Sequence, residues 1–272
     1  MRTSDDAPAT LRVALAQLPA GLDPSDNRAA VTALADDPGL RGAELVVLPE
    51  AFARDFGKPT DDLAPHAEPT DGAFARAVTD LAGADRTVIA GMFEHNSDGP
   101  PFNTLLVRGR ARADYRKIHL YDSFGYRESD RLSAGEWDPV TVALGGFTLG
   151  LMTCYDLRFP ELARDLVDRG ADVLVVPAAW VAGRTPQERA LKVEHWRTLV
   201  RARAIENVCH VVAVGQPGPR YTGHSMVVGP DGQVVVEAGA DRDVITADLR
   251  REQLHEAREA NPSLANRRRR PR

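Results

Sequence analysis

The sequence predicts an α/β fold in which helices cover sheets built from largely buried strands. Three observations indicate this fold: short runs that are apolar along their length, stretches of helical periodicity that alternate with them, and hairpin signals among the strands. The 272 residues suffice to bury a core of the size that such a fold needs. Hairpins mean that the sheet is not purely parallel. A four-layer αββα sandwich accommodates the pattern, although periodicity alone also allows one doubly wound sheet.

The first half of the chain supplies five predicted strands and two predicted helices. Residues 24–27 provide turn and N-cap chemistry for the first helix, and the apolar run at 44–50 ends in a proline and a glutamate. Gly109 provides a turn between two strands. We expect helices over 29–35 and 73–82, and strands over 11–17, 44–50, 87–94, 102–108 and 111–117.

The second half continues the alternation and adds two hairpins. Gly145 and Gly146 join one pair of strands, and an Asp-Gly turn at 231–232 joins the last pair. One helix begins at Pro160 and ends before Gly170, which are the residues favoured at those two ends. We expect helices over 160–169, 187–207 and 251–260, and strands over 141–144, 147–152, 171–180, 209–216, 225–230 and 233–238.

Composition and charge exclude several classes of protein. Apolar residues make up 43% and charged residues 27%, which predicts a soluble, folded chain. Lys and Arg total 34 against 39 Asp and Glu, and five of the arginines lie within the last six residues, so the rest of the chain is more acidic still. An acidic body argues against nucleic-acid binding. With two cysteines, no signal peptide and no membrane-spanning run, we expect a cytoplasmic protein without a membrane partner.

Three residues that could carry chemistry stand at predicted strand ends. Glu50 follows LVVLP, Lys117 follows ADYR, and Cys154 follows TLGLMT. Together a carboxylate, an ammonium and a thiol can perform acyl transfer, because the thiol attacks, the carboxylate takes its proton and the ammonium faces the oxyanion. Each also has a plainer interpretation as a solvated turn residue, a surface charge or a buried structural thiol. Composition and spacing leave both interpretations open.

Three separated stretches decide between these interpretations. VVLPEAF around Glu50, YRKIHLYDSFGYRES around Lys117 and GLMTCYDLRFPELAR around Cys154 resemble the motifs of the nitrilase, or carbon-nitrogen hydrolase, superfamily. The resemblance covers 11–250, and its long blocks are most similar to the Nit-type branch, which includes ω-amidases and deaminated glutathione amidases. We therefore divide the chain into a disordered leader over 1–10, a carbon-nitrogen hydrolase domain over 11–250, and a C-terminal extension over 251–272 that ends in the basic tail.

The resemblance implies an αββα sandwich that assembles as a homodimer or higher homo-oligomer and uses no metal and no organic cofactor. It implies that Cys154 is the nucleophile, that Glu50 is the general base, and that Lys117 stabilises the oxyanion with the backbone N–H of Tyr155. Glu128 matches a second carboxylate that would position Lys117 or the substrate amine. The intervening DSFGY lacks the proline common in Nit-type loops, which leaves the shape of the pocket open.

Further residues have mixed interpretations. Tyr155 and Trp180 are expected to line the substrate pocket, Trp180 with simple core packing as its alternative. Arg158 is interpreted as structural, Arg184 as a solvated loop charge and Cys209 as a core residue.

The expected reaction converts a small linear amide and water to a carboxylate and ammonia through a thioester on Cys154. A nitrilase, an N-carbamoyl amino acid hydrolase or an acyltransferase would use the same residues, so the triad does not choose the substrate. Two alternatives from other classes are a redox-responsive protein that uses Cys154, and a catalytically idle interaction protein.

Overall fold

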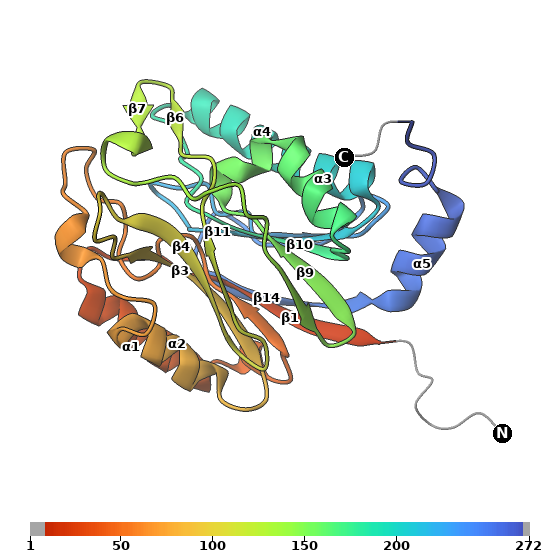
Figure 1. Ribbon diagram of the computed structural model, residues 1–272, viewed down its shortest axis with the longest axis horizontal. Coiled ribbons are helices and arrows are strands. Elements are labelled where there is room, and N and C mark those ends of the chain that lie inside the picture. Colours follow the sequence, from red (N-terminus) through yellow and green to blue (C-terminus); the bar gives the residue numbers. More distant parts are fainter. Residues whose placement is uncertain (1–8, 269–272) are drawn as a thin grey trace.

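The computed structural model describes residues 9–268 (Figure 1). The predicted leader falls largely on residues 1–8 and the end of the basic tail on 269–272, both outside the described residues. The first half of the chain forms β1 (Thr10–Gln17), α1 (Pro24–Ala33), β2 (Leu45–Val47), α2 (Ala73–Ala82), β3 (Thr87–Glu94), β4 (Phe102–Gly109), β5 (Ala113–Arg116), β6 (Asp122–Ser123) and β7 (Tyr126–Arg127).

The second half repeats the same alternation. It forms β8 (Thr141–Leu144), β9 (Phe147–Leu151), α3 (Pro160–Asp168), β10 (Val173–Ala178), α4 (Pro186–Asn207), β11 (His210–Gly215), β12 (Met226–Val228), β13 (Val234–Glu237), β14 (Asp243–Arg250) and α5 (Arg251–Ala260). Short 3-10 turns include η4 (Glu128–Asp130) and η5 (Cys154–Arg158).

Two six-stranded sheets account for most of these strands, and their orders mirror one another. The first sheet runs β14-β1-β2-β3-β4-β5 and the second runs β13-β12-β11-β10-β9-β8. In each sheet the three strands that are parallel to one another lie inside antiparallel neighbours: β1, β2 and β3 in the first, and β9, β10 and β11 in the second. The carboxyl ends of parallel strands are where ligands gather in α/β proteins.

The layers are helix, sheet, sheet, helix (Figure 1). One apolar cluster fills the space between the sheets, where Leu15 and Val47 of the first sheet meet Leu149 and Val175 of the second. A second cluster packs α1 and α2 onto the outer face of the first sheet, and a third packs α3 and α4 onto the second. The αββα sandwich is therefore confirmed, and the single doubly wound sheet is excluded.

The boundaries follow local chemistry. α1 begins at Pro24, five residues before the predicted start, because the Asp23 side chain accepts a hydrogen bond from the Ser25 backbone and caps the helix there. The buried run at 44–50 is a strand only over Leu45–Val47. Among residues 9–268 no helix combines the length and apolarity that crossing a bilayer requires.

One long strand was not predicted. β14 pairs antiparallel with all of β1, from Thr10 opposite Arg250 to Gln17 opposite Asp243. Its sequence DVITADLR is polar at alternate positions and only partly buried, so it lacks the continuous apolar run that identified the other strands. The alternation itself is the signal of a strand at the edge of a sheet.

Candidate active site

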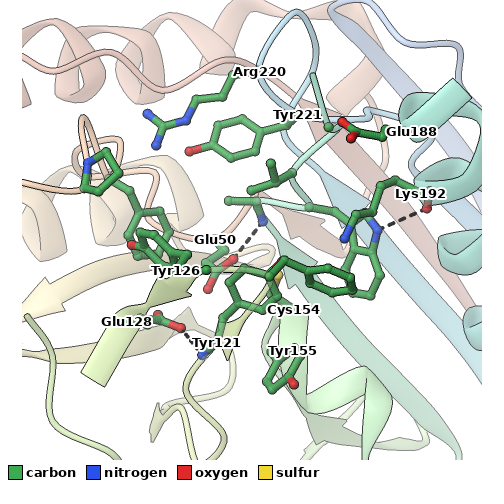
Figure 2. A pocket seen from close by; sticks show the side chains of 18 of the residues that line it. Glu50, Tyr121, Tyr126, Glu128, Cys154, Tyr155, Glu188, Lys192, Arg220 and Tyr221 are labelled. Atoms are coloured by element: carbon green, nitrogen blue, oxygen red, sulfur yellow. Dashed lines mark hydrogen bonds between the residues drawn. The ribbon is translucent and has the colours of Figure 1, made fainter. Parts of the chain in front are cut away.

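Strand ends from both sheets meet at one cavity of about 750 Å³. Glu50 lies three residues past β2, Lys117 directly follows β5, and Cys154 lies three residues past β9. All three side chains line the cavity, as does Glu128 on η4. Figure 2 shows the Glu50 and Glu128 carboxylates and Cys154 beneath a wall of aromatic and cationic side chains. The structure thus brings together the four residues that the motifs single out.

The backbone presents Cys154 in an unusual conformation. Its φ is +45°, in the left-handed region that non-glycine residues rarely adopt, at the start of the turn η5. Such strained residues cluster at functional sites because the surrounding structure holds them there. Only 8% of the residue is exposed, so the thiol reaches solvent solely through the cavity.

Three elements fix the Glu50 carboxylate. Its Oε1 accepts hydrogen bonds from Lys117 Nζ at 2.9 Å and from Asn103 Nδ2 at 2.8 Å, and its Oε2 accepts one from the Ala179 backbone N–H at 2.7 Å. With 1% exposure the carboxylate is held in one orientation by donors from both sheets. A base that is immobilised in this way is poised for proton transfer with a partner of fixed position.

The second carboxylate completes a buried charge cluster. Lys117 Nζ donates to Glu128 Oε2 at 2.8 Å and to Oε1 at 3.0 Å, and the Tyr121 backbone N–H donates to Oε2 at 2.6 Å. Lys117 and Glu128 are 2% and 1% exposed. The ammonium therefore lies between two carboxylates, which satisfies the condition under which a buried charge is tolerated.

Burial and neighbouring charges set the protonation of the cluster. Burial by itself would lower the pKa of Lys117, but the Glu128 and Glu50 carboxylates hold that pKa well above its ordinary value, so the side chain is an ammonium. Burial raises the pKa of Glu128. Burial and the Glu50 charge raise the pKa of the Cys154 thiol well above its ordinary value. These two effects favour the neutral thiol of Cys154 over the thiolate.

The walls of the cavity carry the predicted Tyr155 and Trp180. Trp180 lines the cavity, as predicted, and it also packs in the core, which was the alternative. Its ring lies on Trp196 with 5.4 Å between the ring centroids. Arg158, expected to be structural, places its guanidinium 5.0 Å from the centre of the Trp180 ring and lines the cavity. Arg184 is exposed in its loop, as expected, and it also lines the cavity.

The loop that lacks the proline forms the hairpin β6-β7 at the mouth of the cavity. Phe124 stands at its tip with a φ of +54° and lies under Lys192 of α4, whose Nζ is 3.6 Å from the ring centre. Tyr121 and Tyr126 from the same segment line the cavity below it (Figure 2). Contact between this hairpin and α4 defines one side of the entrance.

Sequence reasoning missed Asn103. This fully buried residue of β4 donates to Glu50 and, at 3.3 Å, to Glu128 Oε1, so its amide bridges the two carboxylates. A signal was present, because an amide within the apolar run FNTLLV has to find buried partners. Cys209, by contrast, lies in the core as expected.

Opposite charges organise the cluster in this site. Over the described range 9–268, no three His, Cys, Asp or Glu side chains are grouped as a metal ion requires. The cluster of Glu50, Lys117 and Glu128 is instead balanced by its own hydrogen bonds and opposite charges.

Comparison with known proteins agrees with the geometry. The profile of the carbon-nitrogen hydrolase family matches residues 12–259. A hydrolase of Mycobacterium tuberculosis is 39% identical over 94% of this chain and 95% of its own. The deaminated glutathione amidase of Escherichia coli O157:H7 is 37% identical over 82% and 84%. The omega-amidase of Mus musculus is 32% identical over 95% of both chains.

Solved structures give the same result. A carbon-nitrogen hydrolase superfamily protein of Xanthomonas campestris, with an arsenic adduct in its active site, is 30% identical, superposes with a TM-score of 0.84, and aligns over 97% of this chain and 99% of its own. A variant of an amidase from Nesterenkonia, which carries the acetamide moiety of fluoroacetamide on its active-site cysteine, is 26% identical with a TM-score of 0.74 over 95% and 97%. The resemblance to Nit-type amidases is confirmed, and this chain is an enzyme that belongs to the carbon-nitrogen hydrolase family.

Proposed function

We propose that this enzyme hydrolyses a small carboxamide to a carboxylate and ammonia through a thioester on Cys154. The observation that carries the proposal is the meeting of a thiol, a fixed carboxylate and a buried ammonium in one cavity. The covalent cysteine adduct of the Nesterenkonia amidase supports the same role for the cysteine here.

Acylation begins with the neutral thiol. Cys154 Sγ bonds to the amide carbon, its proton passes to Glu50, and the carbonyl electron pair moves onto oxygen. The Lys117 ammonium, held between Glu50 and Glu128, stabilises that oxyanion. When the tetrahedral intermediate collapses, the C–N bond breaks and Glu50 returns the proton to nitrogen, so ammonia leaves and a thioester remains.

Deacylation reverses these roles with water in place of the thiol. Glu50 takes a proton from water, the hydroxyl oxygen bonds to the thioester carbon, and Lys117 again stabilises the oxyanion. The C–S bond then breaks, the carboxylic acid is released, and the sulfur recovers its proton from Glu50. Glu50 can serve both steps because its two oxygens are held by separate donors and its orientation does not depend on the substrate.

Two cations indicate the kind of acyl group. Arg158 and Lys192 line the cavity, and within residues 9–268 neither has a carboxylate within 4.0 Å. Burial and the nearby Arg158 lower the pKa of Lys192, and together they outweigh the opposing effect of Glu188, which lines the same cavity. We therefore propose substrates whose acyl half ends in a carboxylate.

The raised thiol pKa argues against the redox alternative. Oxidation by peroxide requires a thiolate, and redox-sensor cysteines have lowered pKa values. Burial and Glu50 act in the opposite direction on Cys154. Hydrolysis, in which a base removes the proton during attack, fits the buried surroundings of the sulfur better.

The experiment measures ammonia release from ω-amides of 2-oxo dicarboxylic acids, short aliphatic amides and N-carbamoyl amino acids. Cys154→Ala should abolish turnover on every substrate. Cys209→Ala is the matched control, because that buried cysteine lies in the apolar cluster of α3 and α4 and does not line the cavity. Folded Cys154→Ala protein that still releases ammonia would exclude the thioester, and slower release from the dicarboxylic amides than from the aliphatic ones would exclude the anionic acyl group.

A further inference from the structure

Asp156 is a fully buried carboxylate that has no place in the chemistry described above. It lies two residues after Cys154 and does not line the cavity. Its Oδ1 accepts hydrogen bonds from the backbone N–H and the Nδ1 of His119, at 3.0 and 2.8 Å. Its Oδ2 accepts one from the Tyr115 hydroxyl at 2.7 Å and one from the Thr153 backbone N–H at 2.9 Å. Both oxygens are thus fully used as acceptors.

These donors come from both sides of the active site. Tyr115 is on β5 of the first sheet and His119 lies four residues further on, so the two bracket Lys117. Thr153 directly precedes Cys154 and belongs to the connection that leaves β9 of the second sheet. One carboxylate therefore ties the segment that carries the ammonium to the turn that carries the thiol.

The surroundings make this tie rigid. The His119 ring stacks on Phe159 with 3.6 Å between centroids and 6° between planes. Tyr115 is fully buried, and burial together with the Asp156 charge raises the pKa of its hydroxyl well above the ordinary value, so it remains a donor. A buried carboxylate with four matched donors has one favourable position, because any displacement leaves polar groups without partners.

We propose that Asp156 is a positioning residue that sets the separation between the Lys117 ammonium and the Cys154 thiol. This inference rests on the proposed function, in which that separation decides how well the oxyanion is stabilised. No hydrogen bond joins Lys117 to Cys154 directly among the described contacts, so their relative position depends on what connects their backbones. Productive geometry requires errors below about 0.5 Å, which packing between two sheets alone seldom provides.

Asp156→Asn is the first test. An amide keeps one acceptor oxygen but turns an NH₂ group toward the other pair of donors, so either the two His119 donors or the pair of Tyr115 and Thr153 lose their acceptor. The expected result is a kcat lower by about 100-fold with KM changed by less than about threefold, measured on the amide that the wild type hydrolyses fastest.

Asp172→Asn is the matched control. Asp172 is another buried carboxylate with several donors, because it binds Arg251 at 2.7 Å, Arg258 at 3.0 Å and the Thr148 backbone at 3.2 Å, and it does not line the cavity. Its replacement should lower the unfolding temperature and leave kcat unchanged. If both variants lose kcat in proportion to their loss of stability, Asp156 is a structural residue and the proposal fails.

Tyr115→Phe covers the case in which Asp156→Asn does not fold. It removes one donor on the Lys117 side and leaves the carboxylate with three. A kcat that falls by a smaller factor than in Asp156→Asn, with KM retained, supports the positioning role of Asp156. A folded Tyr115→Phe or Asp156→Asn enzyme with wild-type kcat overturns it.

Alkylation of Cys154 by iodoacetamide tests the tie without relying on turnover. The titratable groups that face this thiol are Glu50, Lys117 and Glu128, with Tyr121 and Lys192 further out. If Lys117 recedes in Asp156→Asn, the thiol loses a stabilising cation and the alkylation profile moves to higher pH. Local unfolding would expose the sulfur and move the profile to lower pH, which contradicts positioning. A wild type that alkylates normally but hydrolyses no amide would refute the proposed function alone.

Discussion

Lys117 keeps its charge in a place where an isolated ammonium would lose it. Burial opposes the charged form, and only the two carboxylates at 2.8 and 2.9 Å reverse that effect. The cluster of two carboxylates and one ammonium also keeps negative charge near the thiol, which explains why Cys154 rests protonated. In the mechanism proposed above, this arrangement requires that Glu50 remove the thiol proton when the substrate is attacked.

Replacing Lys117 should therefore affect the transition state more than binding. Lys117→Met keeps most of the side-chain volume, and we expect kcat to fall by about 100- to 1000-fold with a small change in KM, as for other lost oxyanion donors.

Lys192→Met should show the opposite pattern on carboxylate-bearing amides, a raised KM with kcat less affected. Steady-state kinetics of both variants checks this, and a Lys117 variant that changes only KM would assign that lysine to binding.

At the scale of elements, the site depends on backbones that approach each other closely. β3 passes directly beside the turn that carries Glu50, where the Gly91 N–H donates to the Pro49 carbonyl at 3.3 Å and the Ala53 N–H donates to the Gly91 carbonyl at 3.0 Å. A Cβ on Gly91 would lie 2.5 Å from the Ala51 nitrogen and 2.9 Å from Glu50 Cα. Glycine is required here because there is no space for a side chain.

Gly91→Ala should consequently displace the Glu50 carboxylate. The contacts are with backbone atoms, which cannot rotate away, so we expect kcat to fall by roughly 10- to 100-fold and stability to fall by about 1–3 kcal/mol. Gly239→Ala is the control, since a Cβ there meets nothing within 4 Å. Kinetics and thermal unfolding of the two variants provide the check, and equal kcat values would show that the Glu50 turn tolerates the shift.

For the whole molecule, the alternation of apolar strands and helices in the sequence was enough to predict most elements, and three motifs were enough to place Glu50, Lys117 and Cys154 in one site. Periodicity could not decide between one sheet and two, because a strand's own pattern does not show which face another sheet covers. Asn103 and Lys192 were missed since their roles arise from contacts between distant segments. The homo-oligomer stays a prediction.

The C-terminal extension begins with the helix that its sequence predicts over 251–260. This helix, α5, packs back on its own chain through the buried Leu254 and through two arginines that bind Asp172. This packing closes over the start of β11, where His210 is buried next to Phe147 with 6.3 Å between ring centroids. The stability of the whole sandwich therefore depends in part on a histidine that is buried away from water.

That histidine makes global stability depend on pH. Burial lowers the pKa of His210 from 6.5 to about 4, so the folded protein binds this proton less tightly than the unfolded chain does. Its contribution is fully present above pH 6.5 and is lost as the pH falls toward 4. Between pH 7 and pH 4.5 the loss amounts to about 2 kcal/mol in the free energy of unfolding.

His210→Leu cannot take up the proton and should lack this part of the acid sensitivity. Denaturant unfolding at pH 7 and pH 4.5 measures it: the free energy of unfolding should fall less for the variant than for the wild type, by about 2 kcal/mol. His255→Gln, at an exposed position on α5, should retain the full wild-type dependence, because that ring is solvated before and after unfolding. Equal acid sensitivity in all three proteins would mean that His210 is protonated without unfolding, through water that reaches the start of β11.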